Sequence, residues 1–357
     1  MVEPASRYVI ILKRDLSLAP VEKRGCSAEG HRVRILTVVH SDGALASYTH
    51  TMAVSKCRRL SGAALRELLD SVESVLFDCD GVIWRGESAI AGAADAVNLL
   101  KECGKRVLFL TNNSTKTRAM YVDKLRRLGF RAAEEDVFGT AFCAAVFLQA
   151  EARLHGKVYL IGSGAMQQEL RNVGIEPVGM GPDPVSGGQT DWAEVALDPE
   201  VRAVLVGFDE HFSYMKLNRA LQYLKDPKCL FVGTNTDSRL PLEDGKAVPG
   251  TGCLLKAVET AAQRQALIVG KPSKFMFNCA ARRYGLDPAK TLMVGDRLDT
   301  DILLGSNCGL KTLLTLTGVS TLAEAKEHQQ SGCPMRLGMV PDYIVESVAE
   351  LLPALQG

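Results

Sequence analysis

Short apolar runs along this chain repeatedly end at a polar or charged cluster. Four such runs are Val75–Phe77, Val107–Leu110, Ala266–Gly270 and Thr291–Gly295. Their length and residue types predict buried strands, and helical stretches lie between them. Strands that alternate with helices predict a parallel sheet with right-handed crossovers and helices on both faces. The predicted fold class is therefore α/β, with a doubly wound, Rossmann-like parallel-sheet core.

One connection in this pattern is too long to be a simple crossover. Roughly 155 residues separate the second polar cluster from the third, whereas ordinary connections are far shorter. The intervening chain has its own apolar runs, at Val158–Ile161, Val201–Val206 and Leu230–Val232. We expect residues 154–265 to form an inserted α/β domain, with residues 52–153 and 266–357 forming the core.

The first 51 residues differ from the rest. Beyond Tyr8–Leu12 and Val33–Val39 they show no clear strand or helix pattern. Glu3 precedes a short apolar run, which argues against a signal peptide, and several acids argue against a mitochondrial presequence. We expect residues 1–51 to be a poorly ordered extension, with Met52 as the usual start.

Composition narrows the classes of function. The chain has 357 residues, of which 46% are hydrophobic, and a formal net charge of +1. That charge gives no argument for a nucleic-acid partner, and no apolar run approaches the ~20 residues of a membrane helix. The ten cysteines are scattered without metal or redox spacing. Reduced thiols in a cytoplasmic protein are therefore expected.

The first polar cluster carries two carboxylates. Asp78 and Asp80 follow Val75–Phe77, and side chains two residues apart on a strand share a face. Both can therefore address one phosphorus atom. Because two anions repel a phosphate, the pair predicts a hard cation such as Mg²⁺ and a third acidic ligand elsewhere. Alone, an Asp-x-Asp-Gly segment could also be a turn.

Three further clusters supply the partners that such a site needs. Thr111 offers a hydroxyl, and the backbone N–H groups that follow it, at Asn112 and Asn113, can also hold phosphate oxygens. Lys271 supplies a positive charge. Asp296 begins an acidic segment after another predicted strand. The pattern favours phosphoryl transfer.

Each of these residues also has an alternative interpretation. Thr111 and Asn112 could cap a helix. Lys271 could be an ordinary solvated lysine. Asp301, like Asp299, could be a favourable charge in a first helical turn, and for Asp299 we keep that interpretation. For the others, joint occurrence in this order makes coincidence improbable.

These four clusters, taken in order, resemble the motifs of the haloacid dehalogenase-like phosphatases over roughly the last 300 residues. The resemblance implies that Asp78 is a nucleophile that forms an aspartyl-phosphate. It implies that Asp80 protonates the leaving oxygen and then activates water. It also implies that Thr111 and Lys271 neutralise the phosphoryl oxygens.

The same resemblance implies a metal site. Asp78, the backbone carbonyl of Asp80 and Asp296 would hold Mg²⁺. Asp301 would orient the metal's waters or Lys271 from a position behind the ligands. Asp299 does not occupy a position that the family pattern requires.

The inserted domain resembles the C2-type cap of this family, which closes over the site, and the resemblance implies a homodimer formed through the caps. The segments Gly207–Tyr214, Gly233–Leu242 and Ala349–Gly357 resemble animal phosphatases of 2-phosphoglycolate and glycerol 3-phosphate. Where a relative places a histidine against the ring of pyridoxal 5′-phosphate, this chain has Leu240. Leucine cannot make that hydrogen bond, so a small phosphate ester fits better, although Leu240 could be simple loop packing.

Several alternatives stay open. A pyridoxal 5′-phosphate phosphatase or a protein phosphatase would use the same chemistry, although a large cap should block bulky substrates. A scaffold protein could keep the fold and lose turnover. A receiver-type signalling domain is disfavoured because it lacks the second aspartate and the cap.

Overall fold

The computed structural model describes residues 35–39, 45–49, 56–241 and 246–356, which belong to two units, Met1–Ser55 and Lys56–Gly357. In the first unit, β1 (Ile35–Val39) and β2 (Leu45–Thr49) form an antiparallel pair. The rest of the expected extension, residues 1–51, lies outside the described residues, and so does Met52, the expected start. Its packing therefore stays a prediction.

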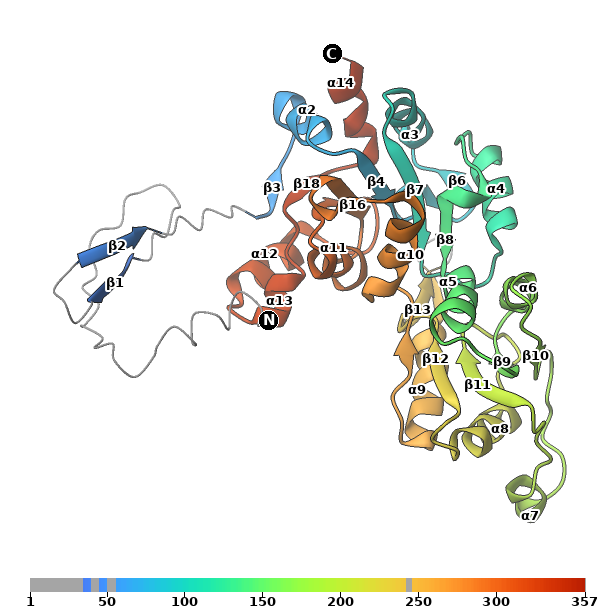
Figure 1. Ribbon diagram of the computed structural model, residues 1–357. Coiled ribbons are helices and arrows are strands. Elements are labelled where there is room, and N and C mark those ends of the chain that lie inside the picture. Colours follow the sequence, from blue (N-terminus) through green and yellow to red (C-terminus); the bar gives the residue numbers. More distant parts are fainter. Residues whose placement is uncertain (1–34, 40–44, 50–55, 242–245, 357) are drawn as a thin grey trace. The chain divides into compact units, whose positions relative to one another are not determined.

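The second unit contains a seven-stranded sheet in which all neighbouring strands are parallel (Figure 1). Its order across the sheet is β3 (Arg58–Arg59), β18 (Tyr343–Val345), β17 (Lys311–Thr315), β16 (Thr291–Gly295), β4 (Ser74–Phe77), β7 (Arg106–Thr111) and β8 (Val137–Gly139). From β4 the chain continues to β7 on one side of the sheet, and it later returns to β16 on the other side. The direction in which strands are added therefore reverses at β4. Open sheets bind ligands outside the carboxyl ends of their strands at such a point.

Alternate residues of the central strands face two different apolar cores. Val75 and Phe77 of β4 pack with one set of helices, whereas Leu76 packs with the other. The first set is α2 (Gly62–Asp70), α3 (Ala93–Glu102), α4 (Arg118–Arg127) and α14 (Leu351–Gln356). The second set is α5 (Thr140–Val146), α10 (Lys274–Tyr284) and α11 (Leu303–Cys308). The predicted doubly wound α/β core is confirmed.

A second, five-stranded parallel sheet follows α5. Its order is β10 (Pro177–Val178), β9 (Lys157–Ile161), β11 (Val201–Val206), β12 (Leu230–Gly233) and β15 (Leu267–Ile268). The strand β15 lies just beyond Gln265, where we expected the insertion to end, and it still pairs with β12 of this sheet.

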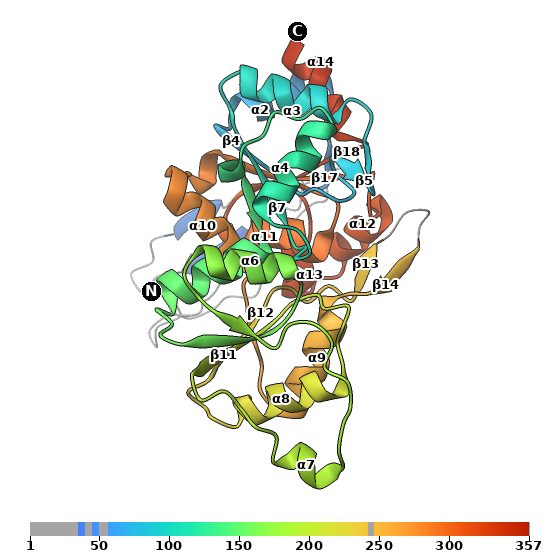
Figure 2. The same cartoon turned by 90° about the vertical axis from the view of Figure 1, so that its right-hand side faces the viewer.

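Helices cover both faces of this second sheet as well (Figure 2). Leu160 and Leu205 face the core that also contains α5 and α6 (Gly164–Asn172). Ile161 and Val206 face α8 (Tyr214–Leu224) and α9 (Thr251–Ala262). One apolar core thus runs continuously from the first sheet to the second.

The remaining described elements are short. Two antiparallel pairs are β5 (Trp84–Arg85) with β6 (Ser88–Ala89), and β13 (Arg239–Pro241) with β14 (Ala247–Pro249). The other helices are α7 (Gln189–Ala193), α12 (Leu322–Gln330) and α13 (Pro334–Gly338). Helical turns occur at Glu134–Asp136, Phe147–Glu151, Pro288–Lys290, Leu298–Ile302 and Val348–Glu350. Within the described ranges, every helix is too short or too polar to span a lipid bilayer.

Candidate active site

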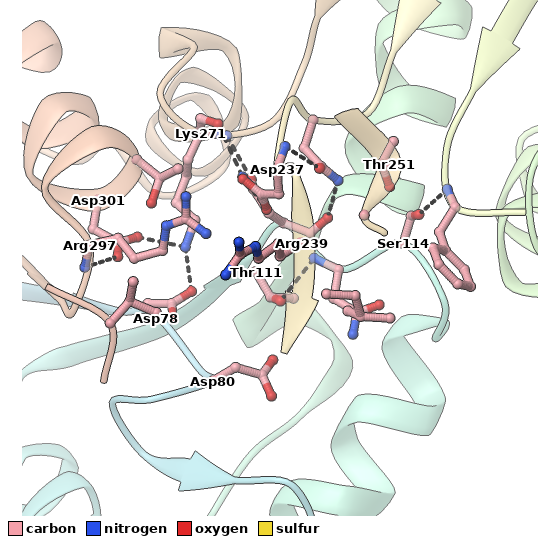
Figure 3. Close-up of a pocket in the computed structure, with 18 of the residues that line it drawn as sticks. Asp78, Asp80, Thr111, Ser114, Asp237, Arg239, Thr251, Lys271, Arg297 and Asp301 are labelled. Carbon is pink, nitrogen blue, oxygen red and sulfur yellow. Dashed lines mark hydrogen bonds and ion pairs between the residues drawn. The ribbon is translucent and has the colours of Figure 1, made fainter. Parts of the chain in front are cut away.

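A cavity lies where the carboxyl ends of β4, β7 and β16 approach the β13–β14 pair (Figure 3). The structure places every site residue expected from the sequence in its lining: Asp78, Asp80, Thr111, Asn112, Asn113, Leu240, Lys271, Asp296 and Asp301. These residues come from separate elements of the chain, so the fold brings together what the sequence keeps apart.

Lys271 forms an ionic bridge at the centre of the cavity. Only 2% of its side chain is exposed, and Nζ donates a hydrogen bond to Oδ1 of Asp78. The same Nζ lies 2.7 Å from Oδ1 of Asp301 and donates to the carbonyl of Leu110 at 3.2 Å. Burial opposes the charged form, but the Asp301 and Asp78 carboxylates outweigh it and raise the pKa of Lys271. The alternative of a solvated lysine is wrong.

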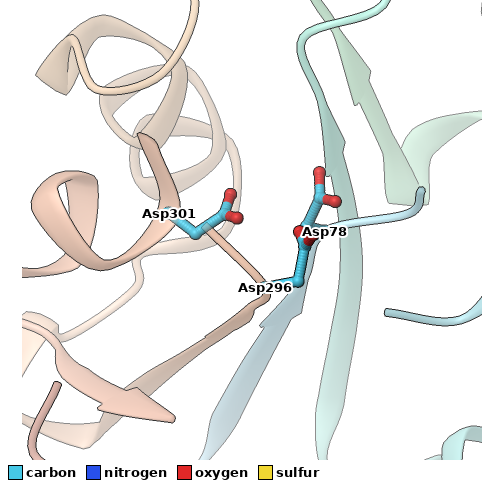
Figure 4. A group of neighbouring side chains, drawn as sticks. All are labelled: Asp78, Asp296 and Asp301. Atoms are coloured by element: carbon cyan, nitrogen blue, oxygen red, sulfur yellow. The ribbon is translucent and has the colours of Figure 1, made fainter. Parts of the chain in front are cut away.

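Three buried carboxylates converge beside this bridge (Figure 4). Oxygen atoms of Asp78, Asp296 and Asp301 lie within 4.8 Å of one another. Burial raises the pKa of Asp78 well above its usual range; Lys271 opposes this shift, and Asp301 adds to it. Burial and Asp301 also raise the pKa of Asp296 to about 7. Ionising Asp78 and Asp296 together therefore requires more positive charge than Lys271 supplies.

The hydrogen bonds of Asp296 support the same conclusion. Its Oδ2 accepts a hydrogen bond from the backbone N–H of Val319 at 2.7 Å. Its Oδ1 is buried and has no hydrogen-bond partner among the described residues. An unpartnered carboxylate oxygen is costly to bury unless a cation is close. Oxygen ligands of this kind suit a hard divalent cation, so the cluster fits a metal site.

Two glycines make room for the Asp296 carboxylate. A Cβ atom on Gly81 would lie 2.7 Å from Oδ2 of Asp296, and Gly81 also has a φ of +88°. A Cβ atom on Gly318 would overlap the same oxygen. Only glycine fits at both positions, because the backbone comes within contact distance of a metal-ligand candidate.

Asp80 is oriented by a neighbouring indole. Nε1 of Trp84 donates a hydrogen bond to Oδ1 of Asp80 at 2.8 Å, and the Trp84 side chain is fully buried. The Trp84 ring stacks on Tyr121 with centroids 6.3 Å apart. A rigid, buried donor therefore fixes one oxygen of Asp80, a residue that lines the cavity.

The side-chain amide of Asn112 is fully engaged with protein groups. Its Oδ1 accepts the backbone N–H of Lys271 at 2.8 Å, and its Nδ2 donates to the Lys271 carbonyl at 3.1 Å. The same Nδ2 lies 3.2 Å from the Asp237 carboxylate. Nearby, the Asn113 N–H donates to Oγ1 of Thr111 at 3.2 Å. The Asn112 side chain therefore positions Lys271. The backbone N–H of Asn112 is the group of this residue that can bind a phosphate.

Comparison with known proteins identifies the family of this chain. Residues 75–176 match the model of the haloacid dehalogenase-like hydrolase family, and residues 268–351 match a second, HAD-hydrolase-like family model. Human glycerol-3-phosphate phosphatase is 57% identical over 313 residues, which cover 85% of this chain and 97% of that protein. The chain belongs to the haloacid dehalogenase-like hydrolases.

Further relatives of this haloacid dehalogenase-like hydrolase are similar over most of its length. Human chronophin is 47% identical over 308 residues, or 85% of this chain and all of that protein. A solved glycerol phosphate phosphatase from Mycobacterium tuberculosis in complex with magnesium has a TM-score of 0.65 and 29% identity. It covers 82% of this chain and 78% of its own. The predicted family and enzyme class, a phosphoric monoester hydrolase, are confirmed.

Sequence reasoning missed three charged residues that line the cavity of this hydrolase: Asp237, Arg239 and Arg297. Arg297 directly follows Asp296, so its position after a strand was a usable signal. Its guanidinium forms two hydrogen bonds to the Asp299 carboxylate, at 3.1 and 2.9 Å. Asp237 lies just before β13 and Arg239 is its first residue, and no local pattern in the sequence gives the direction of this short strand. Asp299 itself lies outside the lining.

Proposed function

We propose that this hydrolase removes phosphate from small phosphomonoesters, with glycerol 3-phosphate and 2-phosphoglycolate as candidate substrates and Mg²⁺ as the cofactor. The supporting observation is the Lys271 bridge between Asp78 and Asp301, set in a cavity that Asp80 also lines. A fixed cation beside a buried carboxylate suits the attack of that carboxylate on a phosphate. The name of the human relative supports glycerol 3-phosphate.

In the first step a carboxylate oxygen of Asp78 attacks phosphorus. The bond between phosphorus and the leaving oxygen breaks, and the proton on Asp80 moves to that oxygen. Lys271 stabilises the charge that develops on the phosphoryl oxygens, and the Thr111 hydroxyl donates to them. The products of this step are the alcohol and an aspartyl-phosphate.

In the second step Asp80, now a carboxylate, takes a proton from water. The water oxygen attacks phosphorus and the bond to Asp78 breaks, which releases inorganic phosphate and regenerates both aspartates. The Trp84 hydrogen bond holds Asp80 in one position for both proton transfers. The same residue therefore serves as acid and as base.

The metal site is part of this proposal. Asp78, Asp296 and the backbone carbonyl of Asp80 would hold Mg²⁺, while Asp301 aligns Lys271 through the ion pair at 2.7 Å. A bound Mg²⁺ would neutralise the negative charge that the carboxylates share with the substrate phosphate. The solved complex of the M. tuberculosis relative with magnesium supports this choice of metal.

We further propose that the five-stranded sheet and its helices, near residues 154–265, act as a cap that selects the leaving group. Phe208 and Leu240 line the cavity from this side.

A homodimer formed through the caps is also part of the proposal. Tyr214 on α8 is half exposed and packs edge-on against Trp192, with ring centroids 5.2 Å apart. It is a candidate contact for such a dimer. Light scattering on a Tyr214→Glu variant would test the dimer. The cytoplasm remains the proposed compartment on the basis of the cysteine pattern.

The deciding experiment measures phosphate release with Mg²⁺, offering glycerol 3-phosphate, 2-phosphoglycolate and pyridoxal 5′-phosphate. We expect release from the first two that is lost in Asp78→Asn and in chelator. Asp123→Asn, an exposed aspartate on α4, is the matched control and should stay active. Preference for pyridoxal 5′-phosphate would overturn the substrate proposal, and absence of Asp78-dependent release would favour a scaffold. Uncatalysed hydrolysis is so slow that modest release is informative.

A further inference from the structure

The charges around the cavity are unequally paired. Its lining has five carboxylates, on Asp78, Asp80, Asp237, Asp296 and Asp301, and three cations, on Arg239, Lys271 and Arg297. Lys271 is held between two of the carboxylates, and Arg297 is held by Asp299. Among the residues that the structure describes, Arg239 has no hydrogen bond or ion pair from its guanidinium. It is the cation of this lining that remains available to a ligand.

The backbone that carries Arg239 is nevertheless well anchored. Arg239 pairs with Pro249 across the β13–β14 ladder. The N–H of Gly250 donates to the carbonyl of Ser238 at 2.9 Å, and the N–H of Gly252 donates to that of Asp237, also at 2.9 Å. A Cβ atom on Gly250 would lie 3.0 Å from the Arg239 nitrogen, so the two backbones are in direct contact. A free guanidinium on a fixed backbone is suited to bind a partner from solution.

The carboxylate of Asp237, two residues before Arg239, has a hydrogen-bond donor of its own. Oxygens of Asp237 accept from Nδ2 of Asn112 at 3.2 and 3.3 Å. Because Asn112 belongs to the loop after β7, this contact directs Asp237 toward the phosphate end of the cavity. Arg239 and Leu240 of β13 line the same cavity, as does Phe208. A leaving group that extends toward β13 would therefore meet Arg239.

We propose that Arg239 is a specificity-determining residue that binds a carboxylate on the leaving group. This inference rests on the proposed phosphatase function and names its preferred substrate class: phosphate esters of hydroxy acids, of which 2-phosphoglycolate is the smallest. A guanidinium binds a carboxylate through two charge-assisted hydrogen bonds, whereas neutral hydroxyl groups accept weaker ones. Glycerol 3-phosphate is therefore accepted, and the carboxylate ester is preferred.

Arg239→Met tests this proposal, since methionine keeps an unbranched apolar stem and removes the charge. We expect the ratio of kcat/KM for 2-phosphoglycolate to that for glycerol 3-phosphate to fall by about tenfold or more, mainly through KM for the acid. Arg239→Lys keeps the charge and should restore part of the ratio. Arg66→Met on α2, away from the cavity lining, is the matched control and should leave the ratio unchanged.

Other outcomes separate the two proposals. An equal loss on both substrates in Arg239→Met would mean a structural role and would overturn the specificity proposal. An unchanged ratio would overturn it as well. Absence of Asp78-dependent release from the wild-type chain would instead reject the proposed phosphatase function. Because Arg239 is exposed, the variant should retain the melting temperature of the wild type.

Discussion

Asn112 pairs its side-chain amide with the main chain of Lys271, accepting from the Lys271 N–H at 2.8 Å and donating to its carbonyl at 3.1 Å. The two residues are 159 positions apart in the sequence. Two hydrogen bonds from one rigid amide fix both the position and the direction of the lysine backbone. The second and third polar clusters of the chain therefore act as one unit.

This pairing predicts that Asn112→Ala impairs catalysis through Lys271. We expect kcat to fall about tenfold or more, since small displacements of a positioned cation are costly. The N–H and the carbonyl of Lys271 also lose their partner, which should lower the free energy of unfolding by about 1–3 kcal/mol for each group. Steady-state kinetics and urea unfolding would measure both effects.

Asn98→Ala is the matched control for that variant. Asn98 makes the same paired contact to backbone, donating to the Gly129 carbonyl and accepting from the Arg131 N–H, both at 2.8 Å. It lies outside the cavity lining. We expect Asn98→Ala to lose stability and keep kcat. Equal kcat in both variants would contradict the positioning role of Asn112.

The Trp84 contact predicts a dependence on the leaving group. Trp84→Phe removes the 2.8 Å hydrogen bond to Asp80 while keeping an aromatic ring in the buried site. Alkyl esters need protonation of the leaving oxygen, so hydrolysis of glycerol 3-phosphate should slow by about tenfold. The p-nitrophenyl ester has a good leaving group and should lose much less. Trp192→Phe is the control, because the Trp192 indole donates to the carbonyl of Ser186; this variant should change neither rate. Equal losses on both esters in Trp84→Phe would exclude this role for Trp84.

The close approach at Gly318 predicts weakened metal binding. In Gly318→Ala the new methyl group overlaps Oδ2 of Asp296, so the carboxylate must move and lose its 2.7 Å hydrogen bond from Val319. We expect the affinity for Mg²⁺, measured by calorimetry, to fall about tenfold. Gly164→Ala is the control, because nothing lies within 4 Å of a Cβ atom there. Unchanged affinity in Gly318→Ala would argue against Asp296 as a ligand.

The raised pKa of Asp296 predicts that the effect of metal on stability depends on pH. With a pKa of about 7 in the folded protein, this carboxyl is protonated below neutral pH and ionises above it. Its folded pKa exceeds the unfolded value, so the metal-free protein loses stability as pH rises toward 7. Mg²⁺ competes with the proton, so the gain in melting temperature should be larger near about pH 8 than about pH 5.5. A pH-independent gain would contradict this assignment.

The predictions from sequence succeeded where a residue's position on a strand decides its direction. Asp78, Thr111 and Asp296 sit at the ends of buried parallel strands, so strand identification alone places them at one edge of the sheet. Arg239 and Asp237 could not be placed in this way, because their direction depends on contacts with α9 and Asn112 that only the tertiary structure provides.

The Asn112 side chain shows a second limit. We expected its backbone N–H to bind phosphate, and a single sequence gives no sign that its side-chain amide is satisfied by a backbone 159 residues away. The Trp84 donor was missed although it is close in sequence to its partner. It lies four residues after Asp80, close in sequence, but the turn that brings the indole back to the carboxylate follows no simple strand or helix period.

The five-stranded sheet ends at β15, and only Val269 and Gly270 separate that strand from Lys271. Gly270 is fixed by its own N–H, which donates to the carbonyl of Thr234 at 2.8 Å. Lys271 therefore follows a strand of the five-stranded sheet, and its side chain contacts Asp78 at the edge of the seven-stranded sheet. Replacing this inserted region with a different one, in evolution or by grafting, would require a new segment that ends in the same short tether. A graft that covered the cavity but changed this length would shift the lysine away from its aspartates.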